Sequence, residues 1–172
     1  SGDTVNVVGT LQNNGGSLPG VTFKEGGTNF TNSLLVGTDA TGTLSSADGN
    51  TGVGTGVLGA LTSGDNNTAI GLDALDANTT ASNNTAVGRK ALFTNTTGTL
   101  NTAVGYNSLL SNTTGACNIG LGNKSLSANT TANDNTAVGL ESLITNTTGH
   151  SNVAVGKESL RSNNTAEQNV AV

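Results

Sequence analysis

The sequence predicts an all-β fold, a parallel β-solenoid (β-roll) in which the chain winds into stacked 17-residue coils. Three observations predict it. A 17-residue unit repeats without insertion or deletion over residues 50–172. The unit is rich in residues that suit strands and turns and are costly inside helices. Its first five residues alternate as a short strand does. A fixed period of this length is typical of solenoids, whose units stack on one another.

Three columns of identical residues define the repeat. Each unit begins with asparagine, has glycine four places later, and has leucine four places after the glycine. The residue before each glycine is Val, Ile or Leu. In six successive units the columns are Asn67, Asn84, Asn101, Asn118, Asn135 and Asn152; Gly71, Gly88, Gly105, Gly122, Gly139 and Gly156; and Leu75, Leu92, Leu109, Leu126, Leu143 and Leu160.

The start of each unit reads as a strand with two distinct sides. Alternation places Thr68 and Ile70 on one side and Asn67 and Ala69 on the other. Coils of equal length stack like residues above one another, so Asn lies on Asn. Each amide can then hydrogen-bond to the coils above and below, which explains a polar residue at every repeat.

The expected core is small. Aromatic residues make up only 2% of the chain, so we expect a core of Val, Ile, Leu and Ala. One Val or Ile and one Leu offer little apolar area against the entropy of ordering a whole repeat unit. We therefore expect association with further copies of the chain, intertwined or side by side, with a monomeric solenoid as the alternative. Corner glycines, at 71 and 98, are expected to have positive φ. Small residues that permit close approach, inside the coil or at a three-fold axis, stand at 69, 86, 103, 120, 137 and 154.

Three segments are expected. They are an N-terminal strand-and-turn segment or connector at 1–32, a degenerate first coil or cap at 33–49, and seven complete coils with the start of an eighth at 50–172. In the degenerate coil Ser33 replaces the asparagine and Thr41 replaces the leucine. A short strand is expected at Thr4–Leu11, followed by turns as far as Gly20. We also expect the full protein to continue beyond Val172, which stands one residue before the next repeat glycine.

Composition and motifs argue against catalysis and several kinds of binding. The net charge of −5 includes no basic stripe for nucleic acid, and no segment approaches the ~20 apolar residues of a membrane span. His150 and Cys117 stand at variable turn positions, where an exposed side chain is the simplest interpretation. Asn-Thr-Thr triplets match glycosylation acceptors, a match we regard as incidental. We expect a non-enzyme with no catalytic residue, no cofactor and no metal.

The two positions after each repeat glycine vary most and carry most of the charge. We expect this edge of the solenoid to face water. Arg89, Lys90, Tyr106 and Lys124 are the candidate residues for contact with a receptor, either a host-surface glycan or a protein. The alternative is that they only keep an outer face soluble.

Units such as Asn101–Leu109 with Asn112–Gly115 resemble the head repeats of YadA-like trimeric autotransporter adhesins. They are even more similar to the longer repeats of bacteriophage tail fibres and other virion appendages. The resemblance covers about 120 of the 172 residues. It implies a trimeric, left-handed parallel β-roll with a role in adhesion or host attachment. The YadA-type unit is shorter than the unit of this chain, so its inside and outside positions are not carried over.

These observations predict a non-catalytic fibre segment of a virion appendage, either shaft or host-contacting head, associated with two further copies of itself. It is expected outside the cell, on the virion surface. The first alternative is the head of a bacterial trimeric surface adhesin, on the cell surface. An ice-binding solenoid is less expected, because the adjacent Thr79 and Thr80 point to opposite sides and leave no Thr-x-Thr grid. A carbohydrate-active solenoid enzyme would need clustered carboxylates, which the sequence does not show.

Overall fold

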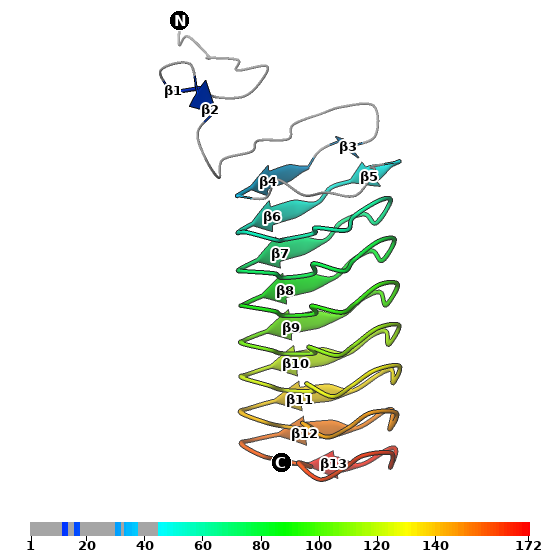
Figure 1. Ribbon diagram of the computed structural model, residues 1–172. Helices are drawn as coiled ribbons and strands as arrows, with labels where there is room; N and C mark the ends of the chain where they lie inside the picture. Colours follow the sequence, from blue (N-terminus) through cyan, green and yellow to red (C-terminus); the bar gives the residue numbers. More distant parts are fainter. Residues whose placement is uncertain (1–11, 14–15, 18–29, 32, 38–44) are drawn as a thin grey trace, which may run out of the picture.

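The computed structural model describes residues 12–13, 16–17, 30–31, 33–37 and 45–172, and within these residues the chain forms thirteen short strands and no helix. In this part of the chain there is consequently no helix that could cross a membrane. Figure 1 shows the rungs stacked along a single axis, each strand connected to the next by a loop. The predicted parallel β-solenoid is confirmed.

The described strands form three sheets. β1 (Gln12–Asn13) pairs antiparallel with β2 (Gly16–Ser17), and β3 (Phe30–Thr31) pairs parallel with β5 (Ala47–Asp48). The main sheet has nine parallel strands. They are β4 (Leu34–Val36), β6 (Thr51–Val53), β7 (Thr68–Ile70), β8 (Thr85–Val87), β9 (Thr102–Val104), β10 (Ile119–Leu121), β11 (Thr136–Val138), β12 (Val153–Val155) and β13 (Val170–Ala171).

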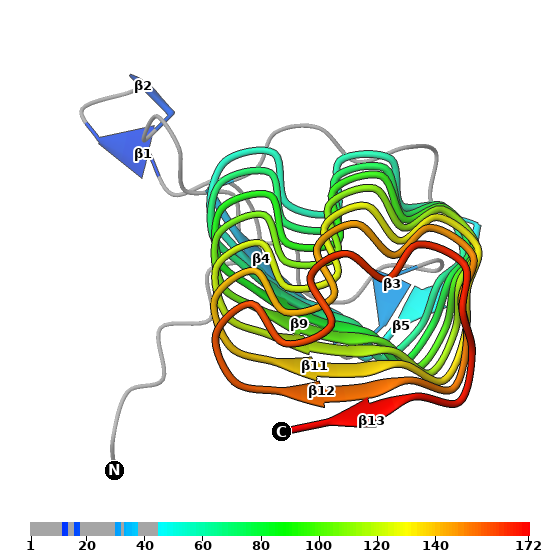
Figure 2. The same ribbon diagram turned by 90° about the horizontal axis from the view of Figure 1, so that it is seen from below.

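In the main sheet each residue pairs with the residue at the same position of the neighbouring repeat. Thr68 lies opposite Thr51 on one neighbouring strand and opposite Thr85 on the other, an offset of one full repeat in each direction. Seen along the axis, the strands line one side of the coil and the remaining residues return through two bulges (Figure 2). Backbone hydrogen bonds join these bulges too, as when the Thr79 N–H donates to the Thr96 carbonyl at 3.2 Å. Like residues therefore form columns around the whole coil.

The asparagine that begins each unit forms a buried column beside the sheet. Asn101 is fully buried, and its Oδ1 accepts hydrogen bonds from the Asn118 backbone N–H at 2.9 Å and the Asn118 Nδ2 at 3.2 Å. Its Nδ2 donates to the Gly115 carbonyl, near the end of the same rung, at 2.8 Å. The predicted ladder is confirmed, and it also joins the start of each rung to that rung's last turn.

A second buried asparagine column runs through the Asn-Thr-Thr triplets and donates to the same carbonyls as the first. Asn112 Nδ2 donates to Asn95 Oδ1 at 2.8 Å and to the Gly115 carbonyl at 2.9 Å. Asn129 continues the column in the same way. These amides point into the coil, where they are not accessible to a glycosylating enzyme. The triplets are therefore structural.

The composition of the core differs from the prediction. Leucines of the repeat column, such as Leu75 and Leu109, are fully buried, and so are the small residues that include Ala69. The expectation that the Val and Ile column belongs to the core is wrong, because Ile70 is 40% exposed and Val104 is 38% exposed. A strand points alternate residues to opposite faces, and Asn and Ala take the inner face. The core therefore consists of Leu, Ala, the two Asn columns and a few other residues.

The small residues at 69, 86, 103, 120, 137 and 154 lie inside the coil rather than on its outer surface. Gly52, at the same place in the first regular coil, shows how little room there is: a Cβ there would come within 2.5 Å of Leu35 Cδ2. A coil this thin leaves space for a methyl group at most.

Each rung changes direction at residues whose backbone has left-handed φ. Gly71 has φ of 121°, as predicted, and a Cβ there would lie 2.8 Å from the carbonyl carbon of Gly88. The expectation for Gly98 is wrong, since its φ is not in the left-handed region. A small residue stands there because the Gly115 carbonyl and the Asn95 amide crowd the position. The repeat leucines also adopt positive φ, 51° at Leu75.

The described part of the degenerate first coil joins the stack. Leu34 of β4 pairs with Thr51 of β6 in the regular register. Ser33 is buried, and its Oγ accepts a hydrogen bond from the Asn50 backbone N–H at 2.8 Å. A serine hydroxyl thus takes the place of the asparagine amide oxygen. Thr41 and the strand expected at Thr4–Leu11 lie outside the described residues.

Candidate functional site

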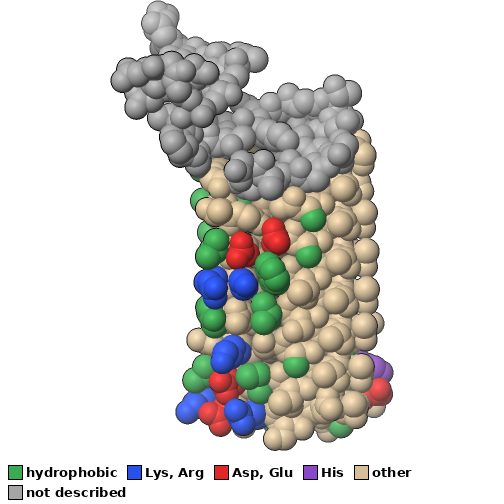
Figure 3. All heavy atoms as spheres, viewed as in Figure 1, with side chains coloured by type: hydrophobic (Ala, Val, Ile, Leu, Met, Phe, Trp, Pro, Cys, Tyr) green, Lys and Arg blue, Asp and Glu red, His purple; other side chains and the backbone are tan. Residues whose placement is uncertain are grey.

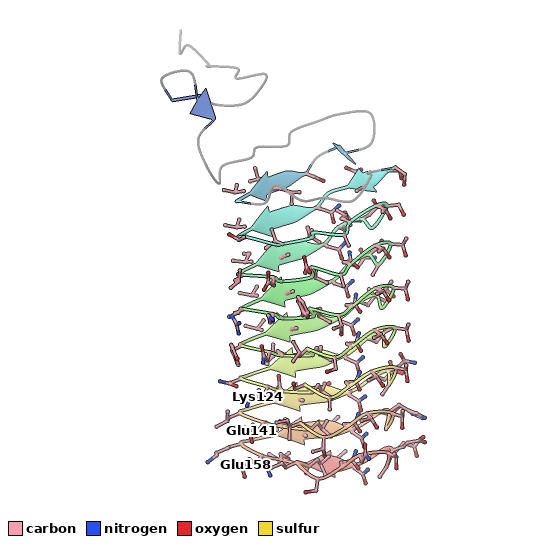
Figure 4. All side chains as sticks on the ribbon, in the orientation of Figure 1. Lys124, Glu141 and Glu158 are labelled. Atoms are coloured by element: carbon pink, nitrogen blue, oxygen red, sulfur yellow. The ribbon has the colours of Figure 1, made fainter. Side chains whose placement is uncertain are left out.

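The candidate contact edge lies where the chain leaves each strand and turns at the repeat glycine. Figure 3 shows charged side chains gathered along one edge of the molecule. Figure 4 shows Lys124, Glu141 and Glu158 projecting from successive rungs at this edge. Columns that are nearly uniform inside the coil give way at this edge to columns of varied residues.

The four candidate residues belong to two neighbouring columns of this edge. Arg89 and Tyr106 occupy the first position after the glycine and are exposed, whereas Lys90 and Lys124 occupy the second and are half-buried. Lys90 and Lys124 both have φ of 57°. The N–H of Lys124 donates to the Tyr106 carbonyl at 2.9 Å, and the equivalent bond is made by Asp73, Lys90, Asn107, Glu141 and Glu158. Left-handed backbone is unfavourable for a residue with a Cβ, and these bonds between rungs hold it in place.

Two aromatic rings hold the long cationic side chains against the surface. The guanidinium carbon of Arg89 lies 5.4 Å from the centre of the Tyr106 ring on the next rung. The ammonium of Lys90 lies 4.7 Å from the centre of the Phe93 ring. Each distance is within the range of an attractive cation–π contact. We call Arg89, Lys90, Tyr106 and Lys124, which lie on successive rungs in the middle of the edge, the basic patch.

Acidic groups flank the basic patch at both ends. From the N-terminal end, the charged side chains of the edge are Asp73, Asp76, Arg89, Lys90, Lys124, Glu141, Lys157, Glu158 and Arg161. Near the C-terminal end, Arg161 Nη2 lies 3.2 Å from Glu141 Oε2 and Lys157 Nζ lies 3.5 Å from Glu158 Oε1. Between Asp76 and Glu141, a stretch that the structure describes in full, this edge carries only cations.

At the N-terminal boundary of the patch the protein perturbs one carboxyl group. Partial burial raises the pKa of Asp76, the neighbouring Asp73 raises it further, and Lys90 opposes both effects. The folded protein therefore binds the Asp76 proton more tightly than the unfolded chain does.

His150 and Cys117 lie on the exposed surface, in columns of variable residues away from the basic patch. His150 Nε2 is 2.9 Å from Glu167 Oε1 one rung away, and both side chains are about half exposed. Within the described residues, no group of three or more His, Cys, Asp or Glu side chains is arranged to hold a metal ion.

The chain matches no family model, no curated protein and no solved structure. Its function is therefore inferred from the fold and from the surfaces that the fold presents.

A second surface emerges from the structure that the sequence predictions did not treat as a site. It is the outer face of the main sheet, formed by the aliphatic residue before each repeat glycine and by the residue two places earlier. The signal was present in the sequence, since Val53, Ile70 and their equivalents are always aliphatic. We expected these residues in the core, and the structure places them outside.

Proposed function

We propose that the chain is a structural and adhesive segment of a virion fibre, a phage tail or head fibre, that acts as shaft or host-contacting head without catalysis. The observation that carries the proposal is the uninterrupted stack of about eight coils in a single register. Such a stack lengthens by adding equal units, and each unit contacts only its neighbours. A rod of constant cross-section is the geometry that a fibre requires.

The proposed fibre contains three copies of the chain. The thin coil supports this, since its core holds Leu and Ala while the Val and Ile column lies outside it. That column is apolar surface left over for contacts between chains, and burying it adds to the stability of the rod. The resemblance of the repeats to trimeric fibre proteins supplies the number three.

The proposed contact surface is the basic patch, and the proposed partner is a host-surface glycan or protein. Tyr106 is 40% exposed, and its ring offers a face on which a sugar or a side chain can stack. Arg89 and Lys124 supply hydrogen-bond donors on either side of it. Binding surfaces on regular folds commonly combine a rigid scaffold with variable outer residues.

Assembly is tested on the chain itself. Sedimentation equilibrium should give three times the mass of one chain, and negative-stain electron microscopy should show rods of uniform width. A monomer at all concentrations would contradict the trimer.

An antibody raised against the coils tests whether the chain belongs to a virion or to a bacterial surface. Labelling of virion appendages is the expected result. Labelling of a bacterial surface in the absence of virions would instead support the alternative, a bacterial adhesin head with the same fold.

A further inference from the structure

The outer face of the main sheet is uniformly uncharged and mostly aliphatic. The nine strands have seventeen outward positions, of which twelve are aliphatic and five are threonine. The aliphatic ones are Leu34, Val36, Val53, Ile70, Val87, Val104, Ile119, Leu121, Val138, Val153, Val155 and Val170. The threonines are Thr51, Thr68, Thr85, Thr102 and Thr136. We call these seventeen residues the aliphatic face.

This face is accessible in the single chain. Val53 and Ile70 are each 40% exposed, and Ile119 is 38% exposed. Contiguous apolar patches of this kind on a soluble protein mark interaction surfaces. The inner strand residues already fill the coil, so the outward side chains are not needed for its core.

Comparison with the adjacent edge shows that exposure to water alone does not explain the composition of the aliphatic face. On that edge the residue just after the glycine changes from Leu72 to Arg89 to Tyr106 along the chain. One residue before the same glycine, every unit keeps Val, Ile or Leu. A face that only meets solvent would tolerate the same variety as its neighbour, including the charges that blunt sheet association.

We infer that the aliphatic face is the surface on which a second copy of this chain packs. The inference rests on the proposed fibre and names the face through which its copies meet. Rungs are spaced by about 4.8 Å, so a partner must present apolar groups at that same interval over the whole length. A second copy does so by construction. An unrelated globular partner matches one or two rungs at most.

The size of the face indicates how much surface the contact uses. Nine strands spaced by about 4.8 Å and about 10 Å wide present roughly 400 Å² in projection, about half of the ~800 Å² per partner of a stable specific interface. The exposed residues Leu72 and Leu140, just past the glycine corner and outside the basic patch, are 43% and 41% exposed and extend the apolar surface round one side. We therefore assign the interface to the aliphatic face together with this flank.

Two matched pairs of lysine variants test the inference in the full chain. Val104→Lys with Val138→Lys places two charges on the aliphatic face. Thr114→Lys with Thr148→Lys places the same charges on exposed positions of the same two coils, outside the sheet. Sedimentation equilibrium should show that the first pair abolishes association and that the second keeps the mass of the unmodified chain.

A milder pair guards against loss of folding. Val104→Thr with Val138→Thr keeps β-branched side chains, and should raise the dissociation constant at least about tenfold because each buried hydroxyl lacks a partner. Circular dichroism should be unchanged. If the unmodified chain is a trimer and both pairs on the aliphatic face leave it trimeric, the inference is wrong and the proposed fibre stands. If the unmodified chain is a monomer, the trimer fails as well. Thermal hysteresis of that monomer, lost in the Val→Lys pair, would show that the face binds ice instead.

Discussion

Replacing Asn101 by alanine removes the side chain that joins two rungs and joins the start of one rung to its last turn. Three hydrogen bonds disappear: from the Asn118 backbone N–H, from Asn118 Nδ2, and from Asn101 Nδ2 to the Gly115 carbonyl. Two of the partners keep another bond, since Asn118 Nδ2 still donates to the Ala132 carbonyl and the Gly115 carbonyl still accepts from the second asparagine column. The Asn118 backbone N–H loses its only partner in a fully buried position.

These losses set the expected magnitude. An orphaned buried N–H costs about 1–3 kcal/mol, and each of the other two bonds contributes about 0.5–1.5 kcal/mol net. Asn101→Ala should therefore lower the free energy of unfolding by about 2–6 kcal/mol. Urea denaturation followed by circular dichroism measures the change. Asn123→Ala is the control, because Asn123 is an exposed asparagine in the next coil. A loss no larger than that of the control would refute the assignment of the column as a stabilising ladder.

Asn101→Asp should make the stability of the chain depend on pH. An ionised aspartate keeps the acceptor for Asn118 but sets a carboxylate oxygen against the Gly115 carbonyl, where the amide donated before. A protonated aspartate can donate there. Burial and this repulsion raise the folded pKa of the new carboxyl above its usual ~3.9. Stability should be nearly that of the unmodified chain at pH 4 and fall as pH rises through the raised pKa. A pH-independent loss would refute the proposed geometry.

Three further substitutions separate the remaining contributions. Leu109→Ala should lower the free energy of unfolding by about 2–5 kcal/mol because Leu109 is fully buried, whereas Leu110→Ala, at the half-buried next position, should cost less in the same urea titration. Gly105→Ala should destabilise by about 1–3 kcal/mol or more, because its φ is 131°. Gly115→Ala should be better tolerated, since its φ is not left-handed and other units carry alanine at this crowded position, and similar melting temperatures for both would contradict this. Asp76→Asn should stabilise the chain at neutral pH. The difference should shrink as pH falls through the raised pKa of Asp76 and vanish below its ordinary value of 3.8, where the carboxyl is protonated in the folded and the unfolded chain; an advantage that grows on acidification would show the opposite sign.

Period and register were predictable because one physical requirement determines both. A parallel ladder pairs each residue with its copy one coil away, so an unbroken 17-residue repeat can have only one in-register arrangement. The asparagine ladder followed from the same argument, since a polar residue at every repeat needs a partner of its own kind. The ladder tolerates some variation in sequence. At Ser33 the shorter hydroxyl replaces the amide oxygen as acceptor for the Asn50 N–H, and the neighbouring strand still joins the sheet.

Which side of each strand is buried was not predictable from alternation, because a period of two defines two faces without saying which one is inside. General hydrophobicity places Ile70 inside and Asn67 outside, and the structure has the reverse. The reason is the width of the coil. The buried leucines already fill the coil, which leaves room beside the strand for alanine and for asparagine amides that hydrogen-bond within it, as Asn67 Nδ2 does to the Ala81 carbonyl at 2.9 Å, and not for a row of isoleucines. Polar groups therefore hold the inside together, and the aliphatic side chains are left on the face where another chain can use them.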